Sequence, residues 1–266
     1  AFCINNAEVS VWAYISEFSY PEDVKNITDL LDTIDYVTEE AVGSKNQRVV
    51  YGNELILNRR RREREIAQEM DVNVAHENFE ICYQPIYNVS NGKYESMEAL
   101  VRMPSRTYGM LMPAEFIPIA ERNGQILRIG DIVLKKVCRF INENRLDEKA
   151  GISSVSVNLS GMQCIQTEMA EHLVRIIDEN GIRHSMIDFE ITESYASSDW
   201  DQLYGNMVQM GRYGINFALD DYGTGYSNTS KVMRYKYSVI KIDKTMLYDA
   251  ESNIQAYILL KHTINM

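Results

Sequence analysis

A set of side chains that can bind a metal ion or move a proton lies between residues 98 and 241: Glu98, Asn158, Glu190, Asp220, Asp221 and Lys241. Carboxylate and amide oxygens suit Mg²⁺ or Mn²⁺ rather than zinc. Carboxylates that crowd together repel one another, and a divalent cation relieves that repulsion. Adjacent carboxylates can serve two metal ions, and such a pair activates water for the in-line cleavage of a phosphodiester.

Each of these positions falls within or directly after a stretch that alternates apolar and polar residues. In residues 187–192, Ile, Phe and Ile alternate with Asp, Glu and Thr. Because successive side chains of a strand point to opposite faces, each stretch predicts a strand with one apolar and one polar face. The apolar faces are expected to pack against outer helices. The polar faces are expected to line the C-terminal mouth of a barrel, where active sites of that architecture lie.

Strands and helices alternate from residue 79 onward. Residues 82–87 and 95–102 are joined by a link too short for a parallel crossover, which predicts an antiparallel hairpin. The βα units that follow are about 30 residues long and predict a mainly parallel sheet, open or closed into a barrel. The expected strands are 154–160, 186–192, 215–221 and 239–244, and the expected helices are 113–122, 130–145, 167–180, 200–213, 227–235 and 252–262.

The first 56 residues predict a small α/β segment. A strand is expected over 9–18, a helix over 24–41 and a short strand over 48–51. A charged helix over 55–70 follows, which contains the run Arg59-Arg60-Arg61-Arg62-Glu63-Arg64-Glu65. Mixed-sign pairs of this kind favour a solvent-exposed linker helix over a nucleic-acid patch.

Composition narrows the classes of function. The chain has 266 residues, 45% of them apolar, and a formal net charge of −11, which argues against binding to a nucleic-acid polymer. Its four cysteines, Cys3, Cys82, Cys138 and Cys164, form no CxxC pair, so we expect a cytoplasmic protein without a disulfide framework or a zinc site. We find no apolar run of about 18 residues and no signal peptide, so no membrane segment is expected within these residues. These observations are compatible with a membrane anchor upstream of Ala1.

The same side chains stand in short motifs that resemble the EAL family of cyclic di-GMP phosphodiesterases. The triplet that gives the family its name is Glu98-Ala99-Leu100, followed by Val101-Arg102, and the order and spacing of the motifs match over residues 79–266. The other motifs are Tyr83-Gln84-Pro85-Ile86, residues 113–121, Val157-Asn158-Leu159-Ser160, Glu190-Ile191-Thr192-Glu193, residues 220–227 and Lys241-Ile242-Asp243.

The resemblance implies an α/β fold, a modified (β/α)₈ barrel of the TIM type whose first strand runs antiparallel. It implies hydrolysis of cyclic di-GMP to linear pGpG with two Mg²⁺ or Mn²⁺ ions. By motif, one metal ion is bound by Glu98, Asn158, Glu190 and Asp220, and the second is approached by Asp220 with Asp221.

The remaining roles concern substrate and assembly. The resemblance implies that Lys241 holds the attacking water and that Gln84 and Arg102 contact the nucleotide. Glu193 would support the loop 221–227, which in this family couples the metal site to dimerisation. We therefore expect a homodimer formed through this domain.

The family's barrel has two more strands than residues 79–266 supply. One of them carries a metal-binding glutamate in an AEGVE-like segment, and the other carries a glutamine that contacts the nucleotide. Six strands are expected from Cys82 onward, whereas a closed barrel of this kind has about eight. We expect an incomplete barrel, with little or no catalysis by residues 1–266 alone.

Residues 1–54 resemble the C-terminal part of a GGDEF, or diguanylate cyclase-like, domain. The motifs are Pro21-Glu22-Asp23, Asp29-Leu30-Leu31 and residues 45–50. GGDEF and EAL domains are commonly joined by a helical linker, here residues 55–78. The cyclase signature loop is absent, so no cyclase activity is expected, and a generic α/β appendage is the alternative interpretation.

Three functions are compatible with these observations. The first is a metal-dependent cyclic di-GMP phosphodiesterase. The second is a catalytically inactive sensor that binds cyclic di-GMP and relays the signal along the helix 55–70. The third is a barrel enzyme that acts on another metal-bound phosphate or an enolate. The intact set of motif residues favours the first, because inactive relatives usually lose some of them.

Overall fold

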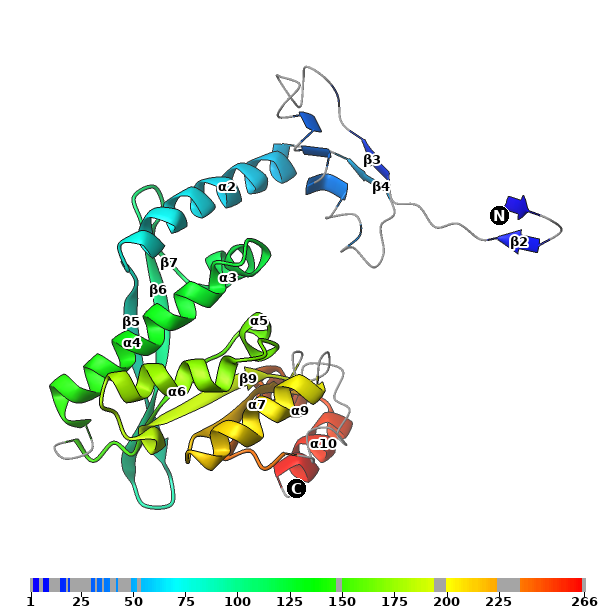
Figure 1. Cartoon of the computed structure of the whole chain (residues 1–266). Coiled ribbons are helices and arrows are strands. Elements are labelled where there is room, and N and C mark those ends of the chain that lie inside the picture. The colour runs from blue at the N-terminus through cyan, green and yellow to red at the C-terminus, as the bar shows by residue number, and fades with distance from the viewer. Residues whose placement is uncertain are drawn as a thin grey trace. The chain divides into compact units, whose positions relative to one another are not determined.

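The chain divides into two compact units, Ala1–Gln68 and Glu69–Met266 (Figure 1). The helix α2 (Glu54–Ala75) contributes residues to both of them. The computed structural model describes residues 2–4, 7–9, 15–17, 19, 30–31, 33–34, 36–38, 42, 49–51, 54–146, 150–193, 200–223 and 235–264.

The N-terminal unit contains two small pairs of strands. β1 (Phe2–Ile4) runs antiparallel to β2 (Ala7–Val9), and β3 (Ile15–Glu17) runs parallel to β4 (Val49–Tyr51). A parallel pair needs a crossover connection, and the described residues between positions 30 and 42 are helical. This arrangement confirms the predicted small α/β segment. Of the strand predicted over 9–18, Val9 belongs to β2 and residues 15–17 form β3, while residues 10–14 and 18 lie outside the described part.

A small core joins this crossover to the start of α2. Val37 is fully buried and packs against Tyr36 and Ile56. The Tyr36 hydroxyl donates to Glu63 Oε1 (3.4 Å), and the Arg60 guanidinium lies 5.7 Å from the centre of the Tyr36 ring, within the range of a cation–π contact. The charged helix therefore packs its own N-terminal half against the α/β segment.

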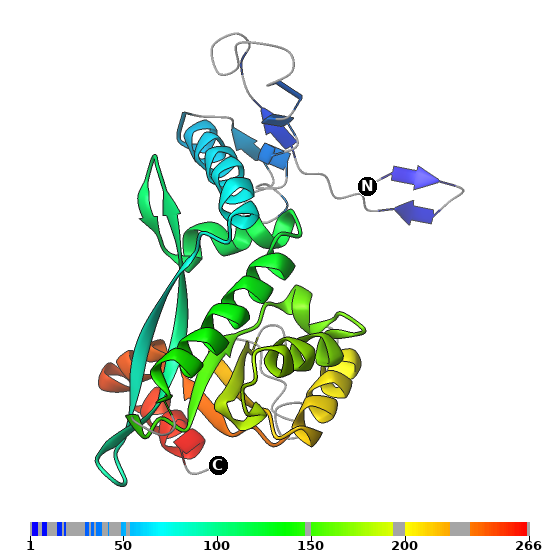
Figure 2. The ribbon, with the colours of Figure 1, turned by 60° about the vertical axis from the view of Figure 1, so that its left-hand side comes forward.

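The C-terminal unit is built on one curled sheet that forms half of a barrel (Figure 2). The strand order is β11-β10-β9-β8-β6-β5; β5 and β6 form an antiparallel hairpin, and the other neighbours are parallel. This confirms the predicted hairpin and the parallel sheet that follows it. The strands are β5 (Glu80–Asn88), β6 (Lys93–Ser105), β7 (Gly109–Leu111), which pairs with β6, β8 (Ser154–Asn158), β9 (Ile187–Thr192), β10 (Asn216–Tyr222) and β11 (Val239–Ile242).

Helices cover the apolar face of this sheet. α3 (Pro113–Arg122) contacts β6, α4 (Ile126–Asn144) contacts β5 and β8, and α7 (Trp200–Arg212) contacts β10. Neighbouring helices pack side by side. Val157, Phe189 and Phe217, on three successive strands, are at most 2% exposed, as the parity of the strands predicted. The helices are α3 (Pro113–Arg122), α4 (Ile126–Asn144), α5 (Gly161–Cys164), α6 (Met169–Glu179), η2 (His184–Met186), α7 (Trp200–Arg212), α9 (Lys244–Ser252) and α10 (Ile254–Ile264).

Several boundaries differ from the sequence-based expectation. α4 begins at Ile126 rather than at Gly130, and this glycine lies inside the helix. β11 ends at Ile242, two residues early, because Asp243 caps the unpredicted helix α9 by accepting a hydrogen bond from Thr245 N (2.8 Å). The helix predicted over 227–235 lies almost wholly outside the described residues.

Among the residues that the structure describes, no helix has both the length and the apolar character needed to cross a bilayer.

Candidate metal centre

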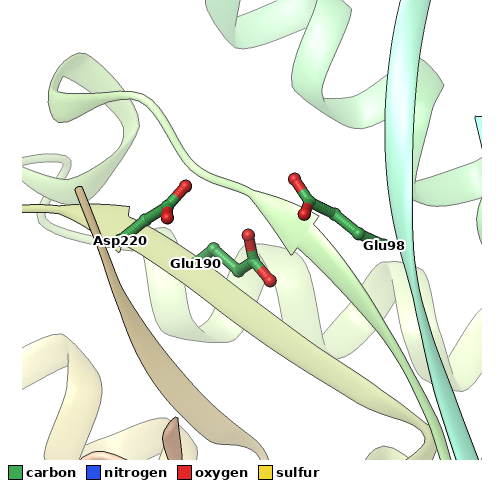
Figure 3. A group of neighbouring side chains, drawn as sticks. All are labelled: Glu98, Glu190 and Asp220. Atoms are coloured by element: carbon green, nitrogen blue, oxygen red, sulfur yellow. The ribbon is translucent and has the colours of Figure 1, made fainter. Parts of the chain in front are cut away.

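Three carboxylates from three strands of the sheet converge on its polar face. Glu98 lies on β6, Glu190 on β9 and Asp220 on β10, and one oxygen of each lies within 4.8 Å of an oxygen of the others (Figure 3). The register explains this convergence, because Asn158 pairs with Glu190 and Asp220 with Thr192 across parallel strands. The alternation of side chains then directs the acidic groups to one face of the sheet.

Glu190 is the most deeply buried of the three, with 1% of its surface exposed. Burial raises the pKa of Glu190 to about 7, and the negative charges of Glu98 and Asp220 add to this effect, while Lys241 opposes it. The Oε1 atom of Glu190 is buried and accepts no hydrogen bond from the described residues. A buried carboxylate oxygen without a partner is costly, so this atom fits the role of a metal ligand.

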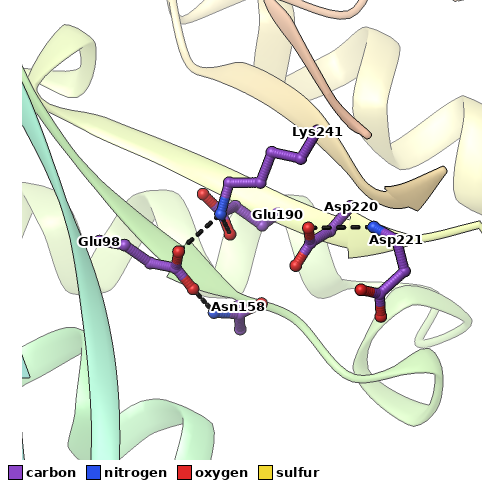
Figure 4. A network of polar contacts seen from close by, with 6 residues as sticks. All are labelled: Glu98, Asn158, Glu190, Asp220, Asp221 and Lys241. Atoms are coloured by element: carbon purple, nitrogen blue, oxygen red, sulfur yellow. Dashed lines mark hydrogen bonds and ion pairs between the residues drawn. The ribbon is translucent and has the colours of Figure 1, made fainter. Parts of the chain in front are cut away.

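Lys241 supplies the positive charge nearest to these carboxylates. Its Nζ donates to Glu98 Oε2 (2.6 Å) and to Glu190 Oε2 (Figure 4). Burial alone lowers the pKa of Lys241, but the hydrogen bonds that it donates to Glu190 and Glu98, with their negative charges, outweigh burial and the net pKa is raised. Asn158 completes the cluster, because its Nδ2 donates to Glu98 Oε1 (2.9 Å).

Asp220 and Asp221 lie in a β-bulge of β10. The register between β10 and β11 shifts by one residue between Leu219 and Tyr222, and Asp221 has a left-handed backbone with a φ of 54°. Its backbone N donates to Asp220 Oδ1 (3.0 Å). Bulges re-aim side chains next to functional sites. Asp221 lies outside the three-carboxylate group, although burial, Asp220 and Asp243 together raise its pKa.

Glu193 lies at the start of the connection that follows β9. Its buried side chain accepts a hydrogen bond from Gly223 N (2.7 Å), and its backbone N donates to Asp220 O (3.1 Å). Gly223 has a φ of 102°, and a Cβ there would lie 1.9 Å from Met246 Sδ, so only glycine fits without a shift. Glu193 therefore holds the first residue after β10, and residues 224–234 lie outside the described part.

Gln84 lies beside Glu98 on the neighbouring strand β5, whereas Arg102 lies further along β6. Gln84 pairs with Glu98 across the hairpin and is exposed on the same face. Arg102 is four residues further along β6, roughly 13 Å at the usual rise of a strand. Its guanidinium donates to the carbonyl of Val101 (2.9 Å).

The donor set fits a divalent cation. The cluster offers carboxylate and amide oxygens, which are the ligands of Mg²⁺, Mn²⁺ and Ca²⁺ rather than of zinc. The buried, unpartnered Oε1 of Glu190 belongs to the same cluster and supplies an independent indication of a ligand.

A cavity of about 470 Å³ opens beside Glu98 and Asn158. Most of its wall is apolar and comes from α3 and α4, with Pro113, Ile117 and Ile129 among the lining residues. A planar or apolar group of a ligand can lie there while a charged group reaches the carboxylates.

Sequence reasoning missed two features of the site. Asp243 lies close enough to Asp221 to raise its pKa and also caps α9; the Asp-x-Thr pattern at 243–245 was an available signal for the cap. The second is a buried hydrogen-bonded pair, Ser160 and Gln163, directly after β8. The spacing of a Ser followed three residues later by Gln is the sequence pattern of a capping box.

The chain is similar to known proteins over most of its length. A model of the EAL domain family matches residues 65–266. The chain is 30% identical over 190 residues to the bifunctional diguanylate cyclase/cyclic di-GMP phosphodiesterase MucR of Pseudomonas aeruginosa, covering 69% of this chain and 28% of MucR. It is 25% identical over 230 residues to the cyclic di-GMP phosphodiesterase NbdA of the same species, covering 86% of this chain and 29% of NbdA.

A solved structure shares the fold. The PaMucR phosphodiesterase in its c-di-GMP complex superposes with a TM-score of 0.68 at 26% identity, over 76% of this chain and 84% of that one. The chain spans less than a third of the length of MucR and NbdA. The match of the family model over most of the chain shows that the chain belongs to the EAL domain family.

Proposed function

We propose that this EAL domain hydrolyses cyclic di-GMP to linear pGpG with two Mg²⁺ or Mn²⁺ ions. The observation that carries the proposal is the cluster of Glu98, Glu190 and Asp220, in which a buried carboxylate oxygen has no partner among the described residues. Relatives named as cyclic di-GMP phosphodiesterases support the choice of substrate. The two-metal mechanism rests on the adjacent carboxylates at the end of β10.

The protein's oxygen atoms would hold the metal ions. Glu98, Asn158, Glu190 and Asp220 would bind the first ion, and Asp220 with Asp221 would bind the second. When bound, the ions supply Lewis acidity at the phosphoryl oxygens and lower the pKa of a bound water. The bulge supports the second role, because it frees Asp221 from the strict alternation of the strand.

Lys241 would orient the water that attacks phosphorus. An ammonium group has three donors, and two of them reach Glu98 and Glu190 in the described structure. The third would donate to the water oxygen. The positive charge would also stabilise the negative charge that develops on the phosphoryl group.

Substrate contacts would come from the two sides of the cluster. Gln84, which pairs with Glu98, and Arg102, whose planar guanidinium suits a phosphate, would hold the nucleotide. The cavity of about 470 Å³ beside Glu98 has room for one base. Because Arg102 and Glu98 are separated along β6, they suit a ligand that extends from the carboxylates along this strand.

We also propose three larger features that the resemblance implies. Residues 1–54 would be the C-terminal part of a GGDEF-like domain, 55–78 a helical linker and 79–266 the EAL domain. Glu193, through its hydrogen bond to Gly223, would connect the metal centre to a homodimer interface. A cytoplasmic location is supported by the absence of paired cysteine motifs.

The test is turnover of cyclic di-GMP with Mg²⁺ and with Mn²⁺, followed by mass spectrometry of the products. It is run on the full-length gene product that carries this sequence and, in parallel, on residues 1–266. Glu98→Ala should reduce pGpG release to background. Asp188→Ala, a carboxylate on the same strand as Glu190 but outside the three-carboxylate group, is the matched control and should stay close to wild type.

The outcomes separate the alternatives. Release of pGpG that needs both a divalent ion and Glu98 supports the enzyme. Binding of cyclic di-GMP by the full-length protein without any pGpG identifies a receptor and overturns the phosphodiesterase proposal. Cleavage of other phosphoesters in preference to cyclic di-GMP overturns the choice of substrate.

A further inference from the structure

A buried amide fixes the connection that follows β8. Gln163 Oε1 accepts hydrogen bonds from the backbone N (3.1 Å) and the Oγ (3.2 Å) of Ser160, and Gln163 N donates to Ser160 Oγ (3.3 Å). Both side chains are less than 9% exposed. The pair forms a closed capping box on the short helix α5.

The other end of this amide rests on the backbone of α4. A Cβ added at Gly130 would lie 2.1 Å from Gln163 Nε2 and 2.8 Å from its Cδ. The space that a side chain would take at position 130 is therefore filled by the glutamine. This contact explains why a glycine, which is unfavourable inside a helix, lies in the interior of α4.

Asn158 lies two residues before this capping box, at the last position of β8. The residue between them is fixed as well, because Leu159 N donates to Glu190 O (2.8 Å). Asn158 Nδ2 donates to Glu98 Oε1 (2.9 Å). The backbone that presents the Asn158 amide is thus anchored on one side to β9 and on the other to Gln163.

We propose that Gln163, seated on Gly130, is a positioning residue for the metal centre: it holds the end of β8 so that the Asn158 side chain stays in place beside Glu98. The inference rests on the proposed function, in which Asn158 is a metal ligand. Gln163 is not among the proposed metal ligands, but it also lines the cavity beside Glu98, so its role is tested by metal affinity without substrate. Groups that orient a metal ligand from behind typically contribute tenfold to a hundredfold in metal affinity.

The chain offers a matched control in Asn206. This residue of α7 is 2% exposed, and its Nδ2 donates to the carbonyls of Cys164 and Gln166 (both 3.0 Å). It therefore stabilises the same short helix with a buried amide, but at the end away from β8. A loss that comes only from weakening α5 should appear in Asn206→Ala as well.

The experiment measures Mn²⁺ affinity by electron paramagnetic resonance on the full-length protein, without substrate. Gln163→Met fills a similar volume but cannot accept from Ser160, and should weaken Mn²⁺ binding about tenfold. Gln163→Glu keeps an acceptor oxygen and should restore most of the affinity. Asn206→Ala should lower the melting temperature while leaving Mn²⁺ affinity close to wild type.

Gly130→Ala tests the contact on α4 independently. It keeps Gln163 but pushes its amide, so it should weaken Mn²⁺ binding as Gln163→Met does. Wild-type affinity in Gln163→Met overturns the inference, and so does an equal loss in Asn206→Ala. If Gln163→Met does not fold, wild-type affinity in Gly130→Ala overturns it instead, and weakened binding in that variant supports it.

The proposed function fails in a different way. If the wild-type protein binds no Mn²⁺, or binds it equally well after Glu98→Gln, the metal centre itself is wrong. If the wild type binds Mn²⁺ through Glu98 and the Gln163 variants do not differ from it, only the positioning role is wrong.

Discussion

At the scale of single residues, Lys241 sets the charge balance of the site when no metal ion is bound. Its Nζ is shared by Glu98 and Glu190, which approach each other in the same small space. Removing one partner from such a cluster leaves uncompensated charge in a poorly hydrated place. The lysine and a cation would then have overlapping electrostatic roles.

Lys241→Met should therefore destabilise the metal-free protein. We expect a loss of about 1–3 kcal/mol in the free energy of unfolding, less than for a fully buried pair because Lys241 and Glu98 are partly exposed. Mn²⁺ should raise the melting temperature of this variant more than that of the wild type, because the cation replaces the missing charge. The exposed Lys236→Met is the control, and equal Mn²⁺ shifts in all three proteins would contradict the prediction.

Cysteine reactivity tests burial and ionisation at the same scale. Burial raises the pKa of both the Cys138 and the Cys164 thiol to about 12, whereas Cys82 is exposed. Thiolates are the reactive form, and at pH 8 about one in 10,000 thiols with a pKa of 12 is ionised. In a Cys3→Ser background, a thiol reagent should label Cys82 alone until the protein is unfolded. Labelling of Cys138 or Cys164 in the native protein would show that the core around α4 and α5 opens.

The sequence was sufficient to predict which residues face the site but not how each is aimed. A period of two along a strand separates its two faces, so the parity of Asn158, Glu190 and Asp220 translated directly into a common face. The aim of Asp221 depends on the bulge, which is a property of the pairing between β10 and β11. Pairing irregularities of this kind leave no periodic signal in one strand alone.

At the scale of elements, the last turns of α2 are bound to the β6–β7 hairpin. Glu69 accepts from Arg106 N and Thr107 Oγ1 (both 2.8 Å), and Asn73 Nδ2 donates to Pro104 O (2.8 Å). α2 extends five residues beyond the predicted end because Met70 and Val74 continue its buried stripe. The helix is thereby attached to the strand that carries Glu98.

Asn73→Ala tests this attachment. The side chain is nearly buried, so its loss leaves the carbonyl of Pro104 without its donor and should cost about 1–3 kcal/mol of unfolding free energy. Urea denaturation measures the change. Gln68→Ala, an exposed position of the same helix, should change stability by less than about 0.5 kcal/mol. Equal effects of the two substitutions would mean that the end of α2 is not held by this bond.

Element types followed from the sequence more readily than their boundaries. The βα alternation predicted the order of strands and helices because periods of 2 and 3.6 are distinct. Gly130 was taken as the start of a helix, and the structure places it inside α4, where the contact with Gln163 outweighs the intrinsic propensity of glycine. The four-residue helix α5 is too short to produce a periodic pattern.

At the scale of the whole molecule, the exposed apolar side chains of α10 suggest a contact surface for the proposed homodimer. Ile254, Tyr257 and Ile258 lie on one face of this helix and are each about half exposed or more. Exposed apolar side chains that share one helix face are typical of an interaction surface. The sequence predicted the fold class of the curled sheet, because the strands of the βα units each have one polar face. Such faces need an interior like that of a barrel, which tolerates polar side chains.

Ile258→Glu should prevent the proposed homodimer from forming. A charge on the patch must be desolvated when two copies meet, while at an exposed position it leaves the fold intact. Light scattering after size-exclusion chromatography gives the mass of the full-length protein, with the exposed Gln255→Glu as the control. A wild-type monomer, or a dimer that persists in Ile258→Glu, would contradict this interface.

The central claim is that Glu98, Asn158, Glu190 and Asp220 form a metal centre. Anomalous X-ray diffraction from crystals of the full-length protein grown with Mn²⁺ locates the ion directly. We expect an anomalous peak within ligand distance of Glu190 Oε1, the buried oxygen that lacks a partner among the described residues, and near the oxygens of Glu98 and Asp220. A protein that binds Mn²⁺ only elsewhere, with Lys241 still bonded to Glu98 and Glu190, would contradict it.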